Sequence, residues 1–303
     1  MATTPTISVL LALDLSVHDK AMLNFLENNS TLKAMDKLFA VHVLSHQLPN
    51  DFPSHLFDIL PSVEEAQDHI QNLVVGYIDE TKIPLEIIIK EGNITDCLLE
   101  VVDEKGIDLV VVGQKSKTES SGITLRKLLR ESKCSLLILP ESCQKIQSVL
   151  NLTDFSERSH EAFKFALGLS EELGVEIQVL HLYQAHFSYL RASESLREMQ
   201  LALKSRSYER FEELKIKKSL TNRVTFHALP LDQKSMEEEI REFANKMNGP
   251  LIVMASKGQT ASATVLLGSI AEAVAMFNIG FPLLIVKRKG EQLGLIDQLT
   301  SLF

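Results

Sequence analysis

A stretch of small residues in the last quarter of the chain has the composition of a phosphate-binding loop. Residues 251–254 form a continuous apolar run, as in a buried parallel strand, and lead into a loop that contains Gly258. Gly268 and Ser269 follow, and apolar residues then recur at helical spacing. A small-residue loop between a strand and a helix N-terminus exposes backbone N–H groups, which bind phosphate. The stretch favours anion binding. The alternative is an ordinary crossover in which the glycines only shape a turn.

Two common nucleotide motifs and several catalytic motifs do not fit this sequence. No lysine precedes Ser269, as GxxxxGK[ST] requires, and Gly258 and Gly268 lie too far apart for GxGxxG. The chain has neither a nucleophile elbow nor an HExxH zinc motif. The glutamates at 237–239 are typical of a solvated helix face. The sequence offers no base and no dedicated magnesium carboxylate for ATP cleavage. We therefore assign no catalytic and no metal-binding residue.

Composition narrows the class of protein. A length of 303 residues indicates two domains, and a formal net charge of −9 argues against a nucleic-acid partner. The three cysteines form no CxxC pair, which fits a reducing compartment. We find no N-terminal signal peptide and no apolar run long enough to span a membrane. We expect a soluble, cytoplasmic protein without a membrane partner.

Short apolar strands alternate with helical segments along the first half. The expected strands cover residues 7–13, 37–44, 85–89, 108–113 and 135–139. This alternation indicates βαβ units and a parallel sheet. Ser16, with Asp19 three residues later, is expected to begin the first helix as a variant capping box.

The pattern then begins again, which indicates a tandem duplication. Its landmarks recur at offsets between 139 and 142 residues. The matched pairs are Asp14 and Asp154, Ser16 and Ser156, His42 and His181, and Gly113 and Ala255. The join lies near residues 142–147 and is short, so we expect the halves to pack against each other.

Both halves resemble domains of the universal stress protein family. The resemblance rests on DLS and TDFS after the first strand of each half and on HV and HL in the second strand. It also rests on the nucleotide loop Gly-x2-Gly-x9-Gly-[Ser/Thr], present here as Ala255-x2-Gly258-x9-Gly268-Ser269. It implies an α/β fold of two tandem doubly wound domains, each a five-stranded parallel sheet of order 3-2-1-4-5 with helices on both faces. The expected domains are residues 1–143 and 144–290, followed by a C-terminal tail, 291–303.

The nucleotide loop of the first half departs from the family pattern. Gly113-x2-Ser116 replaces the first two glycines, and Arg126 and Lys127 stand where Gly-Ser is expected. Aligning Gly122 with the last glycine makes this loop shorter than its counterpart. Fewer glycines present fewer N–H groups at close approach. We expect a degenerate site here, with Arg126 and Lys127 as a solvated helix start.

In the second half the resemblance implies an adenine nucleotide, ATP or AMP, with magnesium accompanying ATP. The implied contacts are Asp154 and Leu182 for the adenine, Ala255 for the ribose, and Gly258, Gly268, Ser269 and Ile270 for the phosphates. Structural explanations stand beside these roles. Asp154 could hold only the turn into the next helix, and Ser156 is expected to be an N-cap. His42 and His181 are expected to be hydrogen-bonded core residues.

We expect a stress-response or regulatory protein that binds one nucleotide in its second half without robust catalysis. One alternative is a nucleotide-free scaffold or interaction protein built as an intramolecular pseudo-dimer. A less favoured alternative is a slow ATPase. The halves are expected to pair through their fifth strands, 135–139 and 283–286, because apolar edge strands invite association. The sequence leaves further dimerisation undecided.

Overall fold

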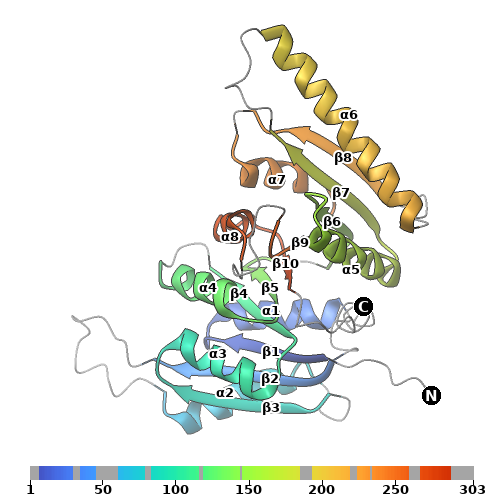
Figure 1. Ribbon diagram of the computed structural model, residues 1–303. Coiled ribbons are helices and arrows are strands. Elements are labelled where there is room, and N and C mark those ends of the chain that lie inside the picture. The colour runs from blue at the N-terminus through green and yellow to red at the C-terminus, as the bar shows by residue number, and fades with distance from the viewer. Residues whose placement is uncertain are drawn as a thin grey trace. The chain divides into compact units, whose positions relative to one another are not determined.

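The structure is a computed structural model in which the chain forms two compact units of similar architecture (Figure 1). It describes residues 7–29, 35–45, 61–78, 83–115, 119–143, 145–184, 193–218, 224–232, 234–258 and 267–287. The first unit, here the first repeat, comprises Met1–Lys145 and Lys287–Phe303. The second repeat comprises Ile146–Val286. The expected tail, 291–303, lies outside the described residues.

The first repeat is a parallel sheet with helices on both faces. Its elements are β1 (Ile7–Leu13), α1 (Val17–Asn28), β2 (Met35–Leu44), α2 (Val63–Val75), β3 (Leu85–Glu91), α3 (Ile94–Lys105), β4 (Leu109–Gln114), α4 (Glu119–Glu131) and β5 (Ser135–Pro140). The strand order is β3-β2-β1-β4-β5, which confirms the predicted 3-2-1-4-5. Right-handed crossovers place α1 and α2 on one face and α3 and α4 on the other. Consistent with this, α3 packs beside α4.

The second repeat repeats this topology. Its elements are β6 (Ser148–Leu152), α5 (Glu157–Leu173), β7 (Glu176–Tyr183), α6 (Ser193–Lys218), β8 (Val224–Pro230), α7 (Met236–Ala244), β9 (Pro250–Ala255), α8 (Ser269–Met276) and β10 (Leu283–Val286). The strands lie in the order β8-β7-β6-β9-β10, and the described pairs are parallel. The two repeats therefore share one fold, as the duplicated sequence predicts.

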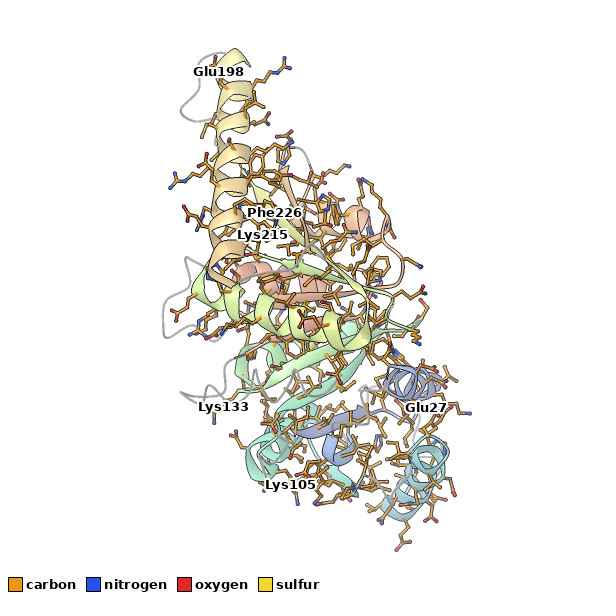
Figure 2. The ribbon with its side chains drawn as sticks, turned by 90° about the vertical axis from the view of Figure 1, so that its right-hand side faces the viewer. Glu27, Lys105, Lys133, Glu198, Lys215 and Phe226 are labelled. Atoms are coloured by element: carbon orange, nitrogen blue, oxygen red, sulfur yellow. The ribbon has the colours of Figure 1, made fainter. Side chains whose placement is uncertain are left out.

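The longest helix, α6, has little helical periodicity in its apolar residues. Most of its residues are polar, and its charged side chains point outward along its length, with Glu198 and Lys215 marking its two ends (Figure 2). It is held by aromatic contacts on its inner face. Phe211 is buried, and its ring stacks on that of Phe226 in β8 with centroids 4.4 Å apart. A few large apolar contacts therefore attach a mostly solvated helix.

The central strands are buried on both faces because helices cover both sides of each sheet. Val9, Leu10 and Leu11 of β1 are completely buried. Leu251 and Ile252 of β9 are equally inaccessible. This burial explains why these strands are continuous apolar runs rather than alternating patterns.

Two local expectations were wrong. Ser16 is the N-cap of α1, but its side chain accepts from the N–H of His18, and the carboxylate of Asp19 turns back to the N–H of Asp14. The expected capping box therefore does not form, because the strand-end amide competes for the same carboxylate. Arg126 and Lys127 lie inside α4, which begins at Glu119, and so do not start a helix.

The left-handed glycine that ends α3 provides a test of the fold's local energetics. Gly106 has φ 64°, and a Cβ built there would meet no atom within 4 Å. Gly106→Ala should therefore cost only the backbone strain, about 1 kcal/mol of unfolding free energy, measured by urea denaturation. Gly106→Asn should cost less, because asparagine tolerates this conformation.

Gly76, which ends α2 at φ −66°, supplies the control. Gly76→Ala should leave the unfolding free energy nearly unchanged, because alanine adopts this conformation without strain. Equal losses at positions 76 and 106 would contradict the assigned cause.

Candidate functional site

Each repeat has a candidate site at the carboxyl ends of its strands, where the strand order reverses. This reversal lies between β1 and β4 in the first repeat and between β6 and β9 in the second. Loops that leave neighbouring strands in opposite directions open a crevice at such a point, and open α/β sheets bind ligands there.

In the second repeat a tight turn presents Asp154 at this edge. Phe155 follows in the left-handed region with φ 60°, and the N–H of Ser156 donates to Asp154 Oδ1 at 2.9 Å. Ser156 then caps α5, accepting from the N–H of Ser159, so its expected role as an N-cap is confirmed. The first repeat has the same turn at residues 14–16, with φ 60° at its middle residue.

A histidine fixes the adjoining strand end in both repeats. His181 Nδ1 lies 2.8 Å from the carbonyl oxygen of Thr153, and His42 Nδ1 lies 2.8 Å from that of Leu13. Because a carbonyl only accepts, each Nδ1 carries the hydrogen and donates. Burial, followed by the nearby charge of Arg210, lowers the pKa of His181, which favours the neutral ring. Both histidines are hydrogen-bonded structural residues, as expected.

The structure brings Asp154 and two of the expected loop glycines together. A Cβ placed on Gly258 would lie 2.6 Å from Asp154 Oδ2, closer than side chains allow. A Cβ on Gly268 would lie 3.4 Å from Lys257 Cα and from the carbonyl oxygen of Ser256. Glycine is therefore needed at Gly258 to admit the carboxylate, and Gly268 lies directly against the loop backbone.

The first turn of α8 presents donors without a side-chain cap. Gly268 is the N-cap, with φ −79°, and among the described residues no side-chain hydrogen bond caps the helix. Its own N–H donates to the carbonyl oxygen of Ser256 at 2.7 Å, so Gly268 does not offer the free N–H that the resemblance implied. Ser269 and Ile270 are exposed, and N–H groups at these first helical positions have no partner within the helix.

The remaining predicted residues are placed at the same edge by their strands. Ala255 ends β9 and is 9% exposed. Leu182 is the penultimate residue of β7 and is half-buried. Because β6 separates β9 from β7, these two residues flank the end of the strand that leads into Asp154. The seven predicted residues thus occupy one edge of one sheet.

Two cationic residues of the second repeat were not identified by the motif comparison. Lys257 is only 8% exposed, and its pKa is lowered by burial and then by the positive charge of Arg158, in the first turn of α5. The signal in the sequence was the repeat offset, because Lys115 and His18 stand at the matching positions. Two like charges near an uncapped helix N-terminus favour an anion.

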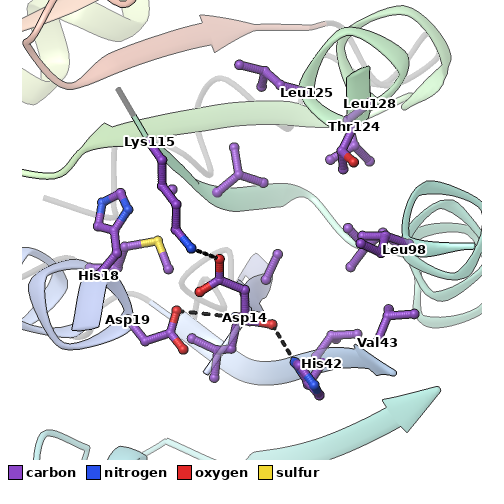
Figure 3. Close-up of a pocket in the computed structure, with 17 residues that line it drawn as sticks. Asp14, His18, Asp19, His42, Val43, Leu98, Lys115, Thr124, Leu125 and Leu128 are labelled. Atoms are coloured by element: carbon purple, nitrogen blue, oxygen red, sulfur yellow. Dashed lines mark hydrogen bonds and ion pairs between the residues drawn. The ribbon is translucent and has the colours of Figure 1, made fainter. Parts of the chain in front are cut away.

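The first repeat uses the same positions differently. The Lys115 ammonium pairs with the Asp14 carboxylate, the group that the resemblance would assign to adenine (Figure 3). Burial would raise the pKa of Asp14, but the bonds from Lys115 and Ser16 prevail and lower it. Only residues 115–118 separate β4 from α4, whereas residues 256–268 separate β9 from α8. The contracted loop is therefore accompanied by an internal cation.

This same edge of the first repeat encloses a cavity of about 240 Å³, which the motif comparison did not predict (Figure 3). Asp19 lines it and is fully buried; its Oδ1 accepts from the N–H of Asp14, while Oδ2 has no hydrogen-bond partner. Burial, reinforced by the charge of Asp14, raises the pKa of Asp19 to about 7. His18 lies beside Gly113, where an added Cβ would be 2.8 Å from the ring.

Metal-binding clusters and membrane spans were sought in the described parts of both repeats. No group of three or more His, Cys, Asp or Glu side chains in these parts could hold a metal ion. None of the helices described is both long and apolar enough to cross a bilayer.

The raised pKa of Asp19 predicts a pH-dependent stability. The folded protein holds this proton up to pH about 7, whereas the unfolded chain loses it near the ordinary aspartate pKa of 3.8, so stability falls as pH rises between these values. Between pH 5 and pH 8 the wild type should lose about 2 to 3 kcal/mol of unfolding free energy relative to Asp19→Asn. Urea denaturation of both proteins at the two pH values measures this. An unchanged difference between them would contradict the assignment.

Comparisons with known proteins agree with the two-repeat architecture. The model of the universal stress protein family matches the chain twice, at residues 8–140 and 145–287. A universal stress protein from Methanocaldococcus jannaschii is 34% identical over 137 residues, which cover 45% of this chain and 79% of that protein.

Solved structures share the whole fold. A universal stress protein from Archaeoglobus fulgidus aligns with a TM-score of 0.65 and 18% identity, covering 95% of this chain and 99% of that one. A functionally unknown protein from Pseudomonas aeruginosa aligns with a TM-score of 0.58 and 12% identity, covering 98% and 96%. At these identities the two structures support the fold alone. Since the family model matches both repeats over nearly their full length, the chain belongs to the universal stress protein family.

Proposed function

We propose that the protein binds one adenine nucleotide, ATP or AMP, at the carboxyl edge of the second repeat, and that this occupancy serves a stress-response or regulatory role. The observation that carries the proposal is the uncapped first turn of α8 beside the buried Lys257. Helix N-termini bind phosphate through exposed N–H groups and the positive end of the helix dipole.

The residues present fit the phosphate part of a nucleotide. Ser269 and Ile270 would supply N–H groups, and Ser269 would add its hydroxyl. Lys257 and Arg158 would supply positive charge to the phosphates, and the charge of Arg158 contributes to the lowered pKa of Lys257. Gly268 packs closely on the backbone of Ser256 and Lys257 and adds no side chain of its own in front of the helix N-terminus.

The residues present also fit the nucleoside part. Asp154 is oriented by the N–H of Ser156 through one oxygen, and its other oxygen points towards Gly258. A carboxylate in this position could accept from the amino group of adenine. Leu182 would contact the base through its backbone, and Ala255 would lie under the ribose with a single methyl group.

The second repeat is a better candidate than the first for electrostatic reasons. In the first repeat Asp14 already holds an internal ammonium, that of Lys115, and the loop before α4 is short. In the second repeat the lysine at the matching position has its pKa lowered by burial and by the charge of Arg158. Anionic phosphates would gain more from the second arrangement.

We propose binding without robust turnover. Attack on a phosphate needs a group that positions or deprotonates water, and we assign no such residue at the α8 edge. Magnesium is proposed to arrive with ATP, coordinated by its phosphates rather than by a carboxylate cluster of the protein.

Titration with ATP tests the proposal most directly. ATP should raise the melting temperature in a saturable manner, because a ligand held only by the folded state stabilises it. Gly268→Val should weaken ATP binding about ten- to hundredfold in isothermal titration, since charge-assisted hydrogen bonds would be lost. Gly122→Ala, inside α4 of the first repeat, is the control and should leave the affinity unchanged. No heat and no melting shift in the wild type at millimolar ATP would favour the scaffold function instead.

Removing the buried cation separates the phosphate contacts from the base contacts. Lys257→Met should weaken ATP binding more than AMP binding, because ATP carries more phosphate charge to this end of the site. The matched variant in the first repeat, Lys115→Met, should change neither affinity. Equal losses for ATP and AMP in Lys257→Met would contradict the placement of the phosphates beside Lys257.

A further inference from the structure

The cavity of the first repeat has apolar walls and one polar end (Figure 3). The side chains that α3 and α4 contribute to its lining are aliphatic, except for Thr124. They include Leu98, Leu125 and Leu128. Its titratable groups come from the strand ends and from α1: Asp14 after β1, Lys115 after β4, His42 on β2, and His18 and Asp19 on α1. A ligand that fits must therefore have an apolar body and one polar head.

The polar end contains two buried acceptors without partners. His18 Nε2 lies 3.1 Å from the carbonyl oxygen of Pro140, so Nε2 carries the hydrogen and the neutral ring leaves Nδ1 as an acceptor. Nδ1 has no partner, and neither has Asp19 Oδ2. Both side chains are more than nine-tenths buried. Unpaired buried polar atoms are costly, and each of these acceptors calls for a hydrogen-bond donor.

The N–H groups at this end are already used, which argues against an anion. The N–H of Asp14 donates to Asp19, that of Ser16 to Asp14, and that of His18 to Ser16. The N–H of Asp19 donates to the carbonyl oxygen of Ser16. The start of α1 is thus capped from within, unlike that of α8. A phosphate or carboxylate would find two carboxyl groups here and few free donors.

The chain itself shows which chemistry this end accepts. An ammonium group, that of Lys115, already lies against the Asp14 carboxylate. The Asp19 carboxyl group has one oxygen without a hydrogen-bond partner, although the charge of Lys115 also acts on this carboxyl group. We propose that the cavity of the first repeat binds a small amphipathic organic cation, a primary ammonium on an apolar body, whose head is held by Asp19 and His18. This site is separate from the proposed nucleotide site and does not depend on it.

The proposal predicts a characteristic pH dependence. Asp19 is half-ionised at pH about 7, so its ionised fraction rises about tenfold between pH 6 and pH 8, while a primary ammonium stays charged. If only the ionised carboxylate binds the cation, affinity rises about tenfold over this interval. His18 and His42 also line the cavity, so the histidine contribution needs its own variant.

The test uses the full chain and three probes of one size: n-pentylammonium, 1-pentanol and pentanoate. Isothermal titration should show saturable binding of pentylammonium, weaker binding of pentanol and none of pentanoate. Asp19→Asn should lose most of the affinity for pentylammonium and its rise with pH. Asp19→Ser should do the same, and it places at this position the residue that the second repeat has at Ser159. His18→Gln should weaken binding but keep the rise with pH.

Two further measurements test the proposal. Lys115→Met should strengthen pentylammonium binding, because it removes the internal competitor for Asp14. Saturating ATP should not displace the probe. Binding of pentanoate as strong as that of pentylammonium would overturn the proposal, as would displacement by ATP. A pH dependence that persists in both Asp19 variants, or no binding in either the wild type or Lys115→Met, would do so too. Urea denaturation of each variant verifies that it is folded.

Discussion

The turn that follows the first strand of each repeat is the constraint on which both candidate sites depend. Leu15 and Phe155 adopt left-handed backbone at φ 60°, which costs a residue with a side chain about 1–2 kcal/mol. The turn is compensated by the preceding aspartate, whose carboxylate accepts the N–H of the following serine. That serine in turn caps the helix. One short segment thus fixes the strand end, the helix start and the direction of an aspartate.

The loop after the fourth strand of each repeat supplies the neighbour of the aspartate. In the second repeat Asp154 lies so close to Gly258 that any Cβ there would collide with its oxygen. In the first repeat the shorter loop brings Lys115 to Asp14 as an ion pair. The matching carboxylates therefore have different neighbours: a lysine in the first repeat and a loop glycine in the second.

The two lysines at matching positions illustrate how environment sets the role of a charge. Lys115 has a carboxylate partner, which offsets its partial burial. Lys257 is buried with Arg158 nearby, and its pKa is lowered accordingly. Conversely, Asp19 is buried beside Asp14, and its pKa is raised. One repeat accumulates positive character at its edge and the other accumulates acceptors.

Much of the fold was determined by the sequence alone. The apolar runs of β1, β6 and β9, the N-cap at Ser156 and the αL glycine that ends α3 all follow from local rules, because strand burial and helix capping depend on neighbouring residues. The repeat offset then matched the elements of the second repeat to those of the first. The tertiary structure alone decided which side chains face each other at the sheet edge. Asp19 satisfies the amide of Asp14 rather than that of Ser16, because the turn after β1 brings this amide to the carboxylate. His18 fills the space beside Gly113, because β1 and β4, distant in sequence, end side by side there. Contacts of that kind depend on loop length and on competition for one carboxylate, and no spacing within a single element records them.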